Sequence, residues 1–132
     1  MSKDYLLDTH VWLWSLLEPE RLRKKTRALL SAPGSTLWLS PVSIWETTVL
    51  VEDRKLELDA DPRRWIQDAI AASGIGEAPL NHEVALQSRE LKLKHDDAAD
   101  RFIAATASVY QFILVTADER LLRGKGYDTM RA

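Results

Sequence analysis

Four acidic residues of this 132-residue chain lie beside apolar segments of the kind that form a protein core. Asp8 and Asp118 each follow a short apolar run. Asp100 precedes one, and Glu46 lies inside one. Carboxylates are rarely buried unless they are paired or bound to a metal ion. Four acids in such positions predict one acidic pocket that holds a divalent cation, and therefore a metal-dependent enzyme.

The mutual repulsion of four carboxylates supports the need for a cation. Two unit charges ~6 Å apart at an effective dielectric constant of ~20 repel by ~3 kcal/mol, and the six pairs together cost on the order of 15 kcal/mol. The free energy of unfolding of a typical domain is only about 5–15 kcal/mol. The pocket must therefore bind a cation or take up protons. Ligands that are all oxygen atoms favour hard ions such as Mg²⁺ or Mn²⁺.

Each acid also has an ordinary structural explanation. Asp8 and Asp118 are suitable N-caps for the helices that follow them. Asp100 lies in the first turn of an expected helix, where the helix dipole favours a negative charge. Helical spacing indicates whether Glu46 faces the core. The helix face that starts at Val42 contains Trp45, Glu46 and Val49. We expect Glu46 to lie on this apolar stripe; the alternative is a Glu at its edge that reaches water.

Thr9 and Thr116 adjoin two of the acids. Their hydroxyls could orient a carboxylate or a metal-bound water, although Thr116 is also an ordinary strand-forming residue. His10 is next to Asp8 in the chain, but we expect its ring to point elsewhere.

The chain alternates between short β-type runs and longer helical patterns. This alternation predicts an α/β fold with a mostly parallel sheet of four to five strands and helices on both faces. In such sheets ligands bind at the carboxyl ends of the strands, where Asp8 and Asp118 are expected. The predicted strands are 5–8, 36–39, a short one within 74–79, 112–116 and 127–130, and the predicted helices are 9–17, 20–31, 40–54, 61–73, 81–91, 98–110 and 118–123.

Length and composition narrow the class of protein. The length suits a single domain that spans residues 1–132. The chain has no cysteine and no apolar run of the ~20 residues that a membrane span requires, so we expect a cytoplasmic protein. The net charge of −2 is not typical of a nucleic-acid-binding protein. Basic residues nevertheless gather in three clusters, which are either solvated helix faces or cations that position phosphates: Arg21, Arg23, Lys24, Lys25 and Arg27; Arg89, Lys92, Lys94 and His95; and Arg120, Arg123 and Lys125.

Four segments of the chain resemble the motifs of the PIN domain, in particular of the VapC-type toxins of bacterial toxin–antitoxin pairs. The resemblance covers the whole chain and keeps the order and spacing of the family, although Ala98 stands where Pro is common. The segments are Leu-Leu-Asp-Thr-His-Val-Trp-Leu-Trp at 6–14, Ser-Ile-Trp-Glu at 43–46, Asp-Ala-Ala-Asp-Arg-Phe-Ile-Ala-Ala-Thr-Ala at 97–107 and Leu-Val-Thr-Ala-Asp at 114–118.

The resemblance implies a three-layer α/β/α sandwich and an endoribonuclease that depends on Mg²⁺ or Mn²⁺. It also implies a homodimer and a cognate VapB-type antitoxin, a segment of which enters and blocks the acidic groove. Asp97 becomes an outer ligand, since this position is often acidic in the family. The acidic quartet of the family falls on Asp8, Glu46, Asp100 and Asp118.

We therefore expect metal-assisted hydrolysis of RNA that leaves 5′-phosphate and 3′-hydroxyl ends. Asp8, Asp100 and Asp118 would hold one or two ions, and Glu46 would be a ligand or would orient the attacking water. The main alternative is a non-catalytic PIN-like domain that acts only by binding a partner. A phosphoacceptor receiver domain and a haloacid-dehalogenase-like phosphatase fit less well, because each requires a second acid close behind the first, where Thr9 and His10 stand.

Two tryptophans lie on the short predicted helix 9–17, which is apolar nearly all round. One face of this helix can pack on the sheet, and the remainder needs another cover. Trp12 and Trp14 are either covered by the helices predicted at 20–31 and 61–73 or contribute to a dimer or antitoxin contact, where Trp is enriched.

Overall fold

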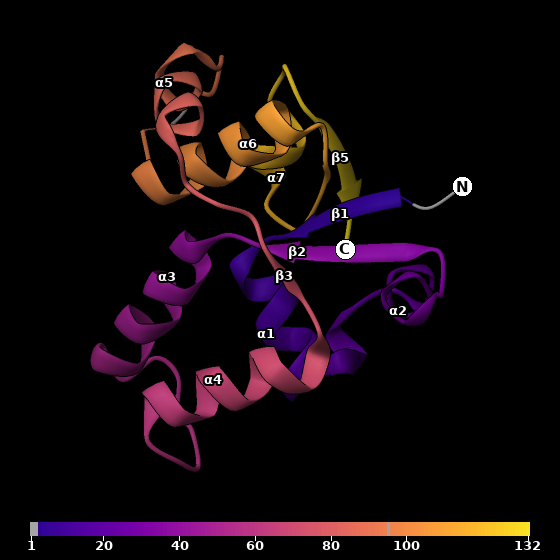
Figure 1. Cartoon of the computed structure of the whole chain (residues 1–132), viewed down its shortest axis with the longest axis vertical. Coiled ribbons are helices and arrows are strands. Elements are labelled where there is room, and N and C mark those ends of the chain that lie inside the picture. Colours follow the sequence, from indigo (N-terminus) through magenta and orange to yellow (C-terminus); the bar gives the residue numbers. More distant parts are fainter. Residues whose placement is uncertain (1–2, 95) are drawn as a thin grey trace.

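A computed structural model describes residues 3–94 and 96–132 of the chain (Figure 1). Its centre is a five-stranded sheet in the order β3-β2-β1-β4-β5, and every neighbouring pair of strands is parallel. The direction in which strands are added reverses at β1, so the switch point lies between β1 and β4. The strands are β1 (Lys3–Leu7), β2 (Ser35–Leu39), β3 (Gly76–Glu77), β4 (Ile113–Thr116) and β5 (Asp128–Arg131).

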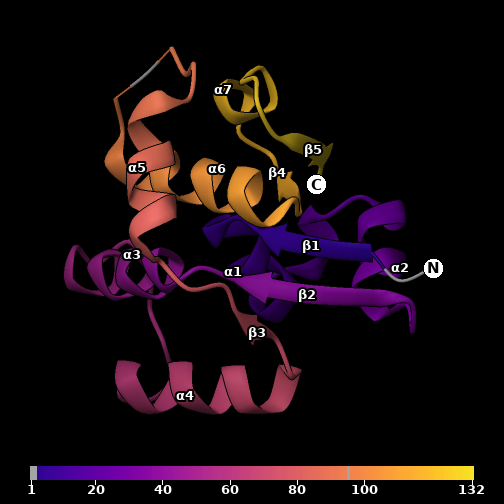
Figure 2. The ribbon, with the colours of Figure 1, turned by 45° about the horizontal axis from the view of Figure 1, so that its top comes forward.

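Helices cover both faces of this sheet, as both views of the ribbon show (Figures 1 and 2). The predicted three-layer α/β/α architecture with a parallel sheet is therefore confirmed. One face carries α1 (Thr9–Leu17), α2 (Lys24–Ser31), α3 (Pro41–Glu52) and α4 (Pro62–Ser73), and the other carries α5 (His82–Glu90), α6 (Ala98–Tyr110) and α7 (Glu119–Leu122).

The central strand β1 supplies apolar side chains to both faces of the sheet. Leu7 packs in the core beneath α1 and α4, whereas its neighbour Leu6 packs in the core beneath α5 and α6. In β4, Val115 packs in the same core as Leu7, and Leu114 packs in the same core as Leu6. Successive side chains of a strand point to opposite faces, and this explains why these strands are continuous apolar runs rather than alternating patterns.

Most predicted elements match the structure to within one or two residues at each end, and two differences have a clear physical cause. The predicted strand at 5–8 begins at Lys3 and ends at Leu7, because Asp8 already caps α1. The predicted helix at 20–31 is interrupted: a 3₁₀ turn spans Pro19–Arg21, and α2 begins only at Lys24. Between them Leu22 is extended, with its side chain buried in the core. Burial of this one apolar side chain breaks the helix that the local pattern favours.

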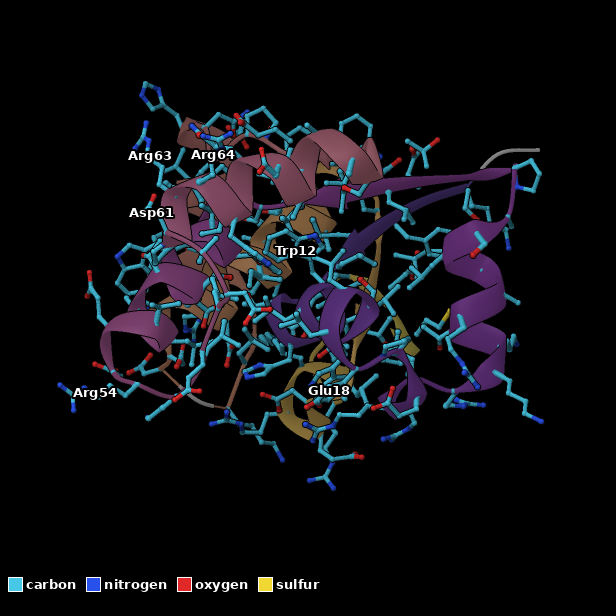
Figure 3. The ribbon with its side chains drawn as sticks, turned by 90° about the horizontal axis from the view of Figure 1, so that it is seen from below. Trp12, Glu18, Arg54, Asp61, Arg63 and Arg64 are labelled. Carbon is cyan, nitrogen blue, oxygen red and sulfur yellow. The ribbon has the colours of Figure 1, made fainter. Side chains whose placement is uncertain are left out.

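The tryptophans of α1 are covered by the chain itself. Trp12, which is labelled in Figure 3, is 1% exposed. Its ring contacts that of Trp65 of α4 edge to face, with ring centroids 6.2 Å apart. Trp14 is half-buried beneath the guanidinium of Arg21, 4.5 Å from its ring centroid. The intramolecular explanation is therefore confirmed for Trp12. In the part of the chain that the structure describes, no helix combines the length and the apolar character needed to cross a membrane.

Candidate active site

The four predicted acids line one hollow of about 570 Å³. Asp8 follows β1 and Asp118 follows β4, and these two strands are neighbours in the sheet. Glu46 projects from α3, and Asp100 from the first turn of α6. A larger cleft of about 690 Å³ between α3 and α4 contains none of the four acids and is lined mainly by apolar side chains. The chemistry therefore belongs to the smaller hollow.

Asp8 is buried, and both of its carboxylate oxygens accept hydrogen bonds. The backbone N–H of Thr9 donates to Oδ1 at 2.9 Å, and the hydroxyl of Thr116 donates to Oδ2 at 2.7 Å. Burial raises the pKa of Asp8 above its ordinary value, and these two hydrogen bonds offset only part of the rise. The nearby charge of Asp118 raises the pKa further. The carboxylate is thus held in position but is costly to ionise without a cation.

Glu46 also accepts a hydrogen bond inside the site and has a raised pKa. The hydroxyl of Thr9 donates to Glu46 Oε1 at 2.6 Å, and it also lies 2.9 Å from the hydroxyl oxygen of Ser43. Burial is the main cause that raises the pKa of Glu46, and the negative charges of Asp8 and Asp100 raise it further. The predicted crowding of acids is therefore confirmed, because neighbouring negative charges make Glu46 harder to ionise.

The reason predicted for the inward position of Glu46 is wrong. Trp45, which was placed on the buried stripe of α3, is 61% exposed. The buried residues of α3 are instead Ser43 and Thr47, one turn apart. The hydroxyl of Thr47 donates to the carbonyl of Ser43 at 2.8 Å, so its polar group is satisfied within the helix. Glu46 faces the site because it lies three residues after Ser43, on the same side of α3.

The remaining acids both cap helices and line the hollow. Asp97 caps α6 and accepts from the backbone N–H of Asp100 at 3.0 Å. Asp118 caps α7 and accepts from the backbone N–H of Arg120 at 2.8 Å. Asp97, predicted as an outer ligand, lines the same hollow as the other acids. The ordinary explanations of Asp8 and Asp118 as N-caps and of Asp100 as a first-turn acid are thus correct, and these positions also place the three carboxylates at the hollow.

A cationic side chain already contacts two of these acids. Nη2 of Arg120 lies 3.2 Å from Oδ2 of Asp118 and 3.8 Å from Oδ2 of Asp100. Sequence reasoning placed Arg120 in a basic cluster and missed this contact. The available signal was its position two residues after Asp118. Ser43 was missed as well, although its spacing of three residues from Glu46 could have revealed it.

The donor atoms of this hollow suit a hard divalent cation. Most are carboxylate oxygens, and each oxygen of Asp8 accepts one hydrogen bond and keeps acceptor capacity for an ion. His10, which was expected to point elsewhere, also lines the hollow. Within residues 3–94 and 96–132, no three acidic or histidine side chains are already arranged as a metal-binding group. Burial, together with the neighbouring negative charges, raises the pKa of Asp8 and of Glu46, so a bound cation would favour the ionised form of both carboxyl groups.

Comparisons with known proteins agree with the fold. The model of the PIN domain family matches residues 5–126, and the chain belongs to this family. Ribonuclease VapC22 of Mycobacterium tuberculosis is 32% identical over 119 residues, which cover 88% of each chain.

Solved structures share the fold at lower sequence identity. One is VapBC2 from Rickettsia felis, bound to a DNA fragment from its promoter, with a TM-score of 0.73, 15% identity and coverage of 97% of this chain and 98% of that one. Another is FitAcB from Neisseria gonorrhoeae, with a TM-score of 0.63, 23% identity and coverage of 96% of both chains. The likeness extends over nearly the whole chain.

Proposed function

We propose that this protein is a divalent-metal-dependent endoribonuclease that hydrolyses RNA phosphodiester bonds, and that it is the toxin of a toxin–antitoxin pair. The observation that carries the proposal is the convergence of four carboxylates from four separate elements on one hollow. The PIN domain family and the 32% identical relative, which is named a ribonuclease, support the same activity.

Each acid has a proposed role in the reaction. Asp8, Asp100 and Asp118 hold the ion, and Glu46 either completes its coordination or orients the attacking water. When bound, Mg²⁺ or Mn²⁺ supplies Lewis-acid chemistry that activates water and neutralises charge at the scissile phosphate. Cleavage leaves 5′-phosphate and 3′-hydroxyl ends.

Residues around the acids fix their orientation. Thr9 contacts both Asp8 and Glu46, and Thr116 contacts Asp8. These bonds keep the carboxylate oxygens in place before the ion arrives. Asp97 holds the first turn of α6, and thereby the backbone of Asp100, and serves as an outer ligand.

The substitution Asp8→Asn tests the assignment. Asn keeps the shape and the helix-capping ability of Asp, so the protein should stay folded but lose RNA cleavage with Mg²⁺ or Mn²⁺, because it loses the charge that binds the ion. The measurement is cleavage of total RNA with each ion and with EDTA, alongside a thermal melt of each variant.

Asp68→Asn is the matched control, because this acid of α4 is exposed and pairs only weakly with Arg64 at 3.7 Å. It should cleave RNA at the wild-type rate. Full activity of Asp8→Asn, or an equal loss in Asp68→Asn, would sink the assignment. A wild-type protein that cleaves no RNA with either ion would instead favour the non-catalytic alternative.

We further propose a homodimer and a VapB-type antitoxin as partners, with the cytoplasm as the place of action. Solved structures of the same fold include VapBC and FitAB complexes, and large apolar side chains such as Trp45 and Leu86 are about three-fifths exposed on this chain, at 61% and 60%. Light scattering of the purified protein should give twice the 15.0 kDa mass of one chain. A mass of one chain at micromolar concentration would contradict the dimer.

A further inference from the structure

A second hollow, of about 330 Å³, shares one wall with the acidic site, because Arg120 lines both. We call it the basic hollow. Two clusters that are separate in the sequence meet here, and no acidic residue is among the lining side chains. His95, from the first of those clusters, lies outside the described residues. The lining residues are Lys92, Leu93, Lys94, Arg120, Arg123, Gly124 and Lys125.

One wall of the basic hollow is fixed by a buried arginine of α6. Nη1 of Arg101 donates to the carbonyls of Ser88 at 2.9 Å and Leu91 at 3.2 Å, and Nη2 donates to the carbonyl of Leu93 at 3.2 Å. Burial of a cation is costly unless its donors are satisfied. Arg101 therefore holds the segment after α5 in one path, and that path presents Lys92 and Lys94 to solvent.

The other wall, the turn between α7 and β5, packs directly against the first. A Cβ atom added to Gly124 would lie 2.7 Å from Cδ2 of Leu93 and 2.0 Å from the hydroxyl oxygen of Tyr127. Only glycine allows this approach. The hydroxyl of Tyr127 donates to the carbonyl of Leu121 at 2.6 Å. Burial raises the pKa of Tyr127 to about 12, so this donor keeps its proton.

The cations of the basic hollow are mostly uncompensated. In the part of the chain that the structure describes, Lys92, Lys94, Arg123 and Lys125 form no ion pair with a carboxylate. All four are exposed. They sit beside an acidic site that repels a polyanion until a cation is bound. Protein–protein interfaces are depleted in lysine, so a hollow with three lysines is better suited to phosphates.

We propose that the basic hollow binds backbone phosphates of the RNA strand next to the bond that is cut. This inference rests on the proposed ribonuclease function. Arg120 lines both hollows. An RNA strand whose phosphates bind Lys92 and Lys125 would therefore continue past Arg120 to the acids. The hollow thus sets the direction in which the strand crosses the active site.

The test compares two double variants that remove the same charge. Lys92→Gln with Lys125→Gln acts in the basic hollow. Lys24→Gln with Lys25→Gln acts at the start of α2, where neither lysine lines the basic hollow or the acidic hollow. All four lysines are exposed, so both variants should fold. The measurement is fluorescence anisotropy of a labelled single-stranded RNA oligonucleotide in EDTA, over a range of salt concentrations.

The Lys92/Lys125 variant should bind RNA several-fold more weakly than wild type. Loss of two phosphate contacts should lower the slope of log K against log[salt] by about 1.4, because each contact on a single strand contributes about 0.7. The Lys24/Lys25 variant should keep the wild-type slope.

Several outcomes overturn the proposal. One is an equal loss in both variants, which would mean that only net charge matters. Another is unchanged RNA binding by the Lys92/Lys125 variant together with lost binding of an oligoglutamate peptide, which would assign the hollow to an acidic protein segment. If the Lys92/Lys125 variant cleaves RNA with an unchanged KM, the basic hollow does not bind the substrate, and the proposed ribonuclease function stands. If RNA binding requires the basic hollow but the wild-type protein cleaves no RNA with Mg²⁺ or Mn²⁺, the proposed ribonuclease function is contradicted instead.

Discussion

Thr116 links the two acids that follow neighbouring strands. Its hydroxyl donates to Oδ2 of Asp8 at 2.7 Å and accepts from the backbone N–H of Asp118 at 3.1 Å. The residue is fully buried at the end of β4. One hydroxyl therefore orients the Asp8 carboxylate, lowers its pKa and positions the start of the Asp118 cap.

The exchange of Thr116 for Val tests this role, because Val has the same shape without the hydroxyl. Loss of such a supporting hydrogen bond typically costs about 10–100-fold in metal affinity or activity. The pKa of Asp8 should rise further, because the bond that lowers it is gone, and the pH–rate profile should shift to higher pH. The measurements are the Kd for Mn²⁺ by calorimetry and the RNA cleavage rate against pH.

The matched control is Thr116→Ser, which keeps the hydroxyl and should retain most of the activity and the wild-type pH profile. If Thr116→Val matched wild type in Mn²⁺ affinity and pH profile, the link between the two acids would have no part in the site.

At this scale the sequence predicted residue types better than contacts. The four acids, Thr9 and Thr116 could be found because a polar group beside an apolar run is unusual. Ser43 and Arg120 were missed. Their spacing from Glu46 and Asp118 made them candidates, but their contacts depend on which way α3 and α7 turn their side chains. That direction is decided by packing against other elements rather than by the local sequence.

Among the elements, the helix boundaries with strong capping signals were predicted well. Ser40 accepts from the backbone N–H of Val42 at 3.0 Å, and Asn81 accepts from that of Val84 at 3.0 Å. These caps act within a few residues, so the sequence alone reveals them. The break at Leu22 and the outward side chain of Trp45 depend on long-range packing, and both were missed.

Helix α3 shows why apolar periodicity can point to the wrong face. It buries the small polar residues Ser43 and Thr47, whose hydroxyls find partners in Thr9 and in the helix backbone. Small side chains allow α3 to pack beside α1, which brings Glu46 within 2.6 Å of Thr9. Apolar periodicity cannot identify this buried face of α3, because its buried residues are small and polar.

For the whole molecule, the strand order is what gathers the chemistry. Because β1 and β4 are neighbours at the point where the order reverses, the residues that follow them, Asp8 and Asp118, meet at one edge of the sheet. α3 and α6 contact each other, and each contributes one further acid to that edge. The sequence predicted the parallel sheet but not its order, since pairing between distant strands leaves no local signal.

The central claim is that these carboxylates hold a divalent cation. The most direct test is a crystal of the protein grown with Mn²⁺, with anomalous diffraction used to locate the ion. We expect an anomalous peak among Asp8, Asp100 and Asp118, with the guanidinium of Arg120 displaced from Asp118 and Asp100, which it contacts at 3.2 Å and 3.8 Å without the ion. No peak in this hollow, in crystals of a protein that cleaves RNA with Mn²⁺, would contradict the account.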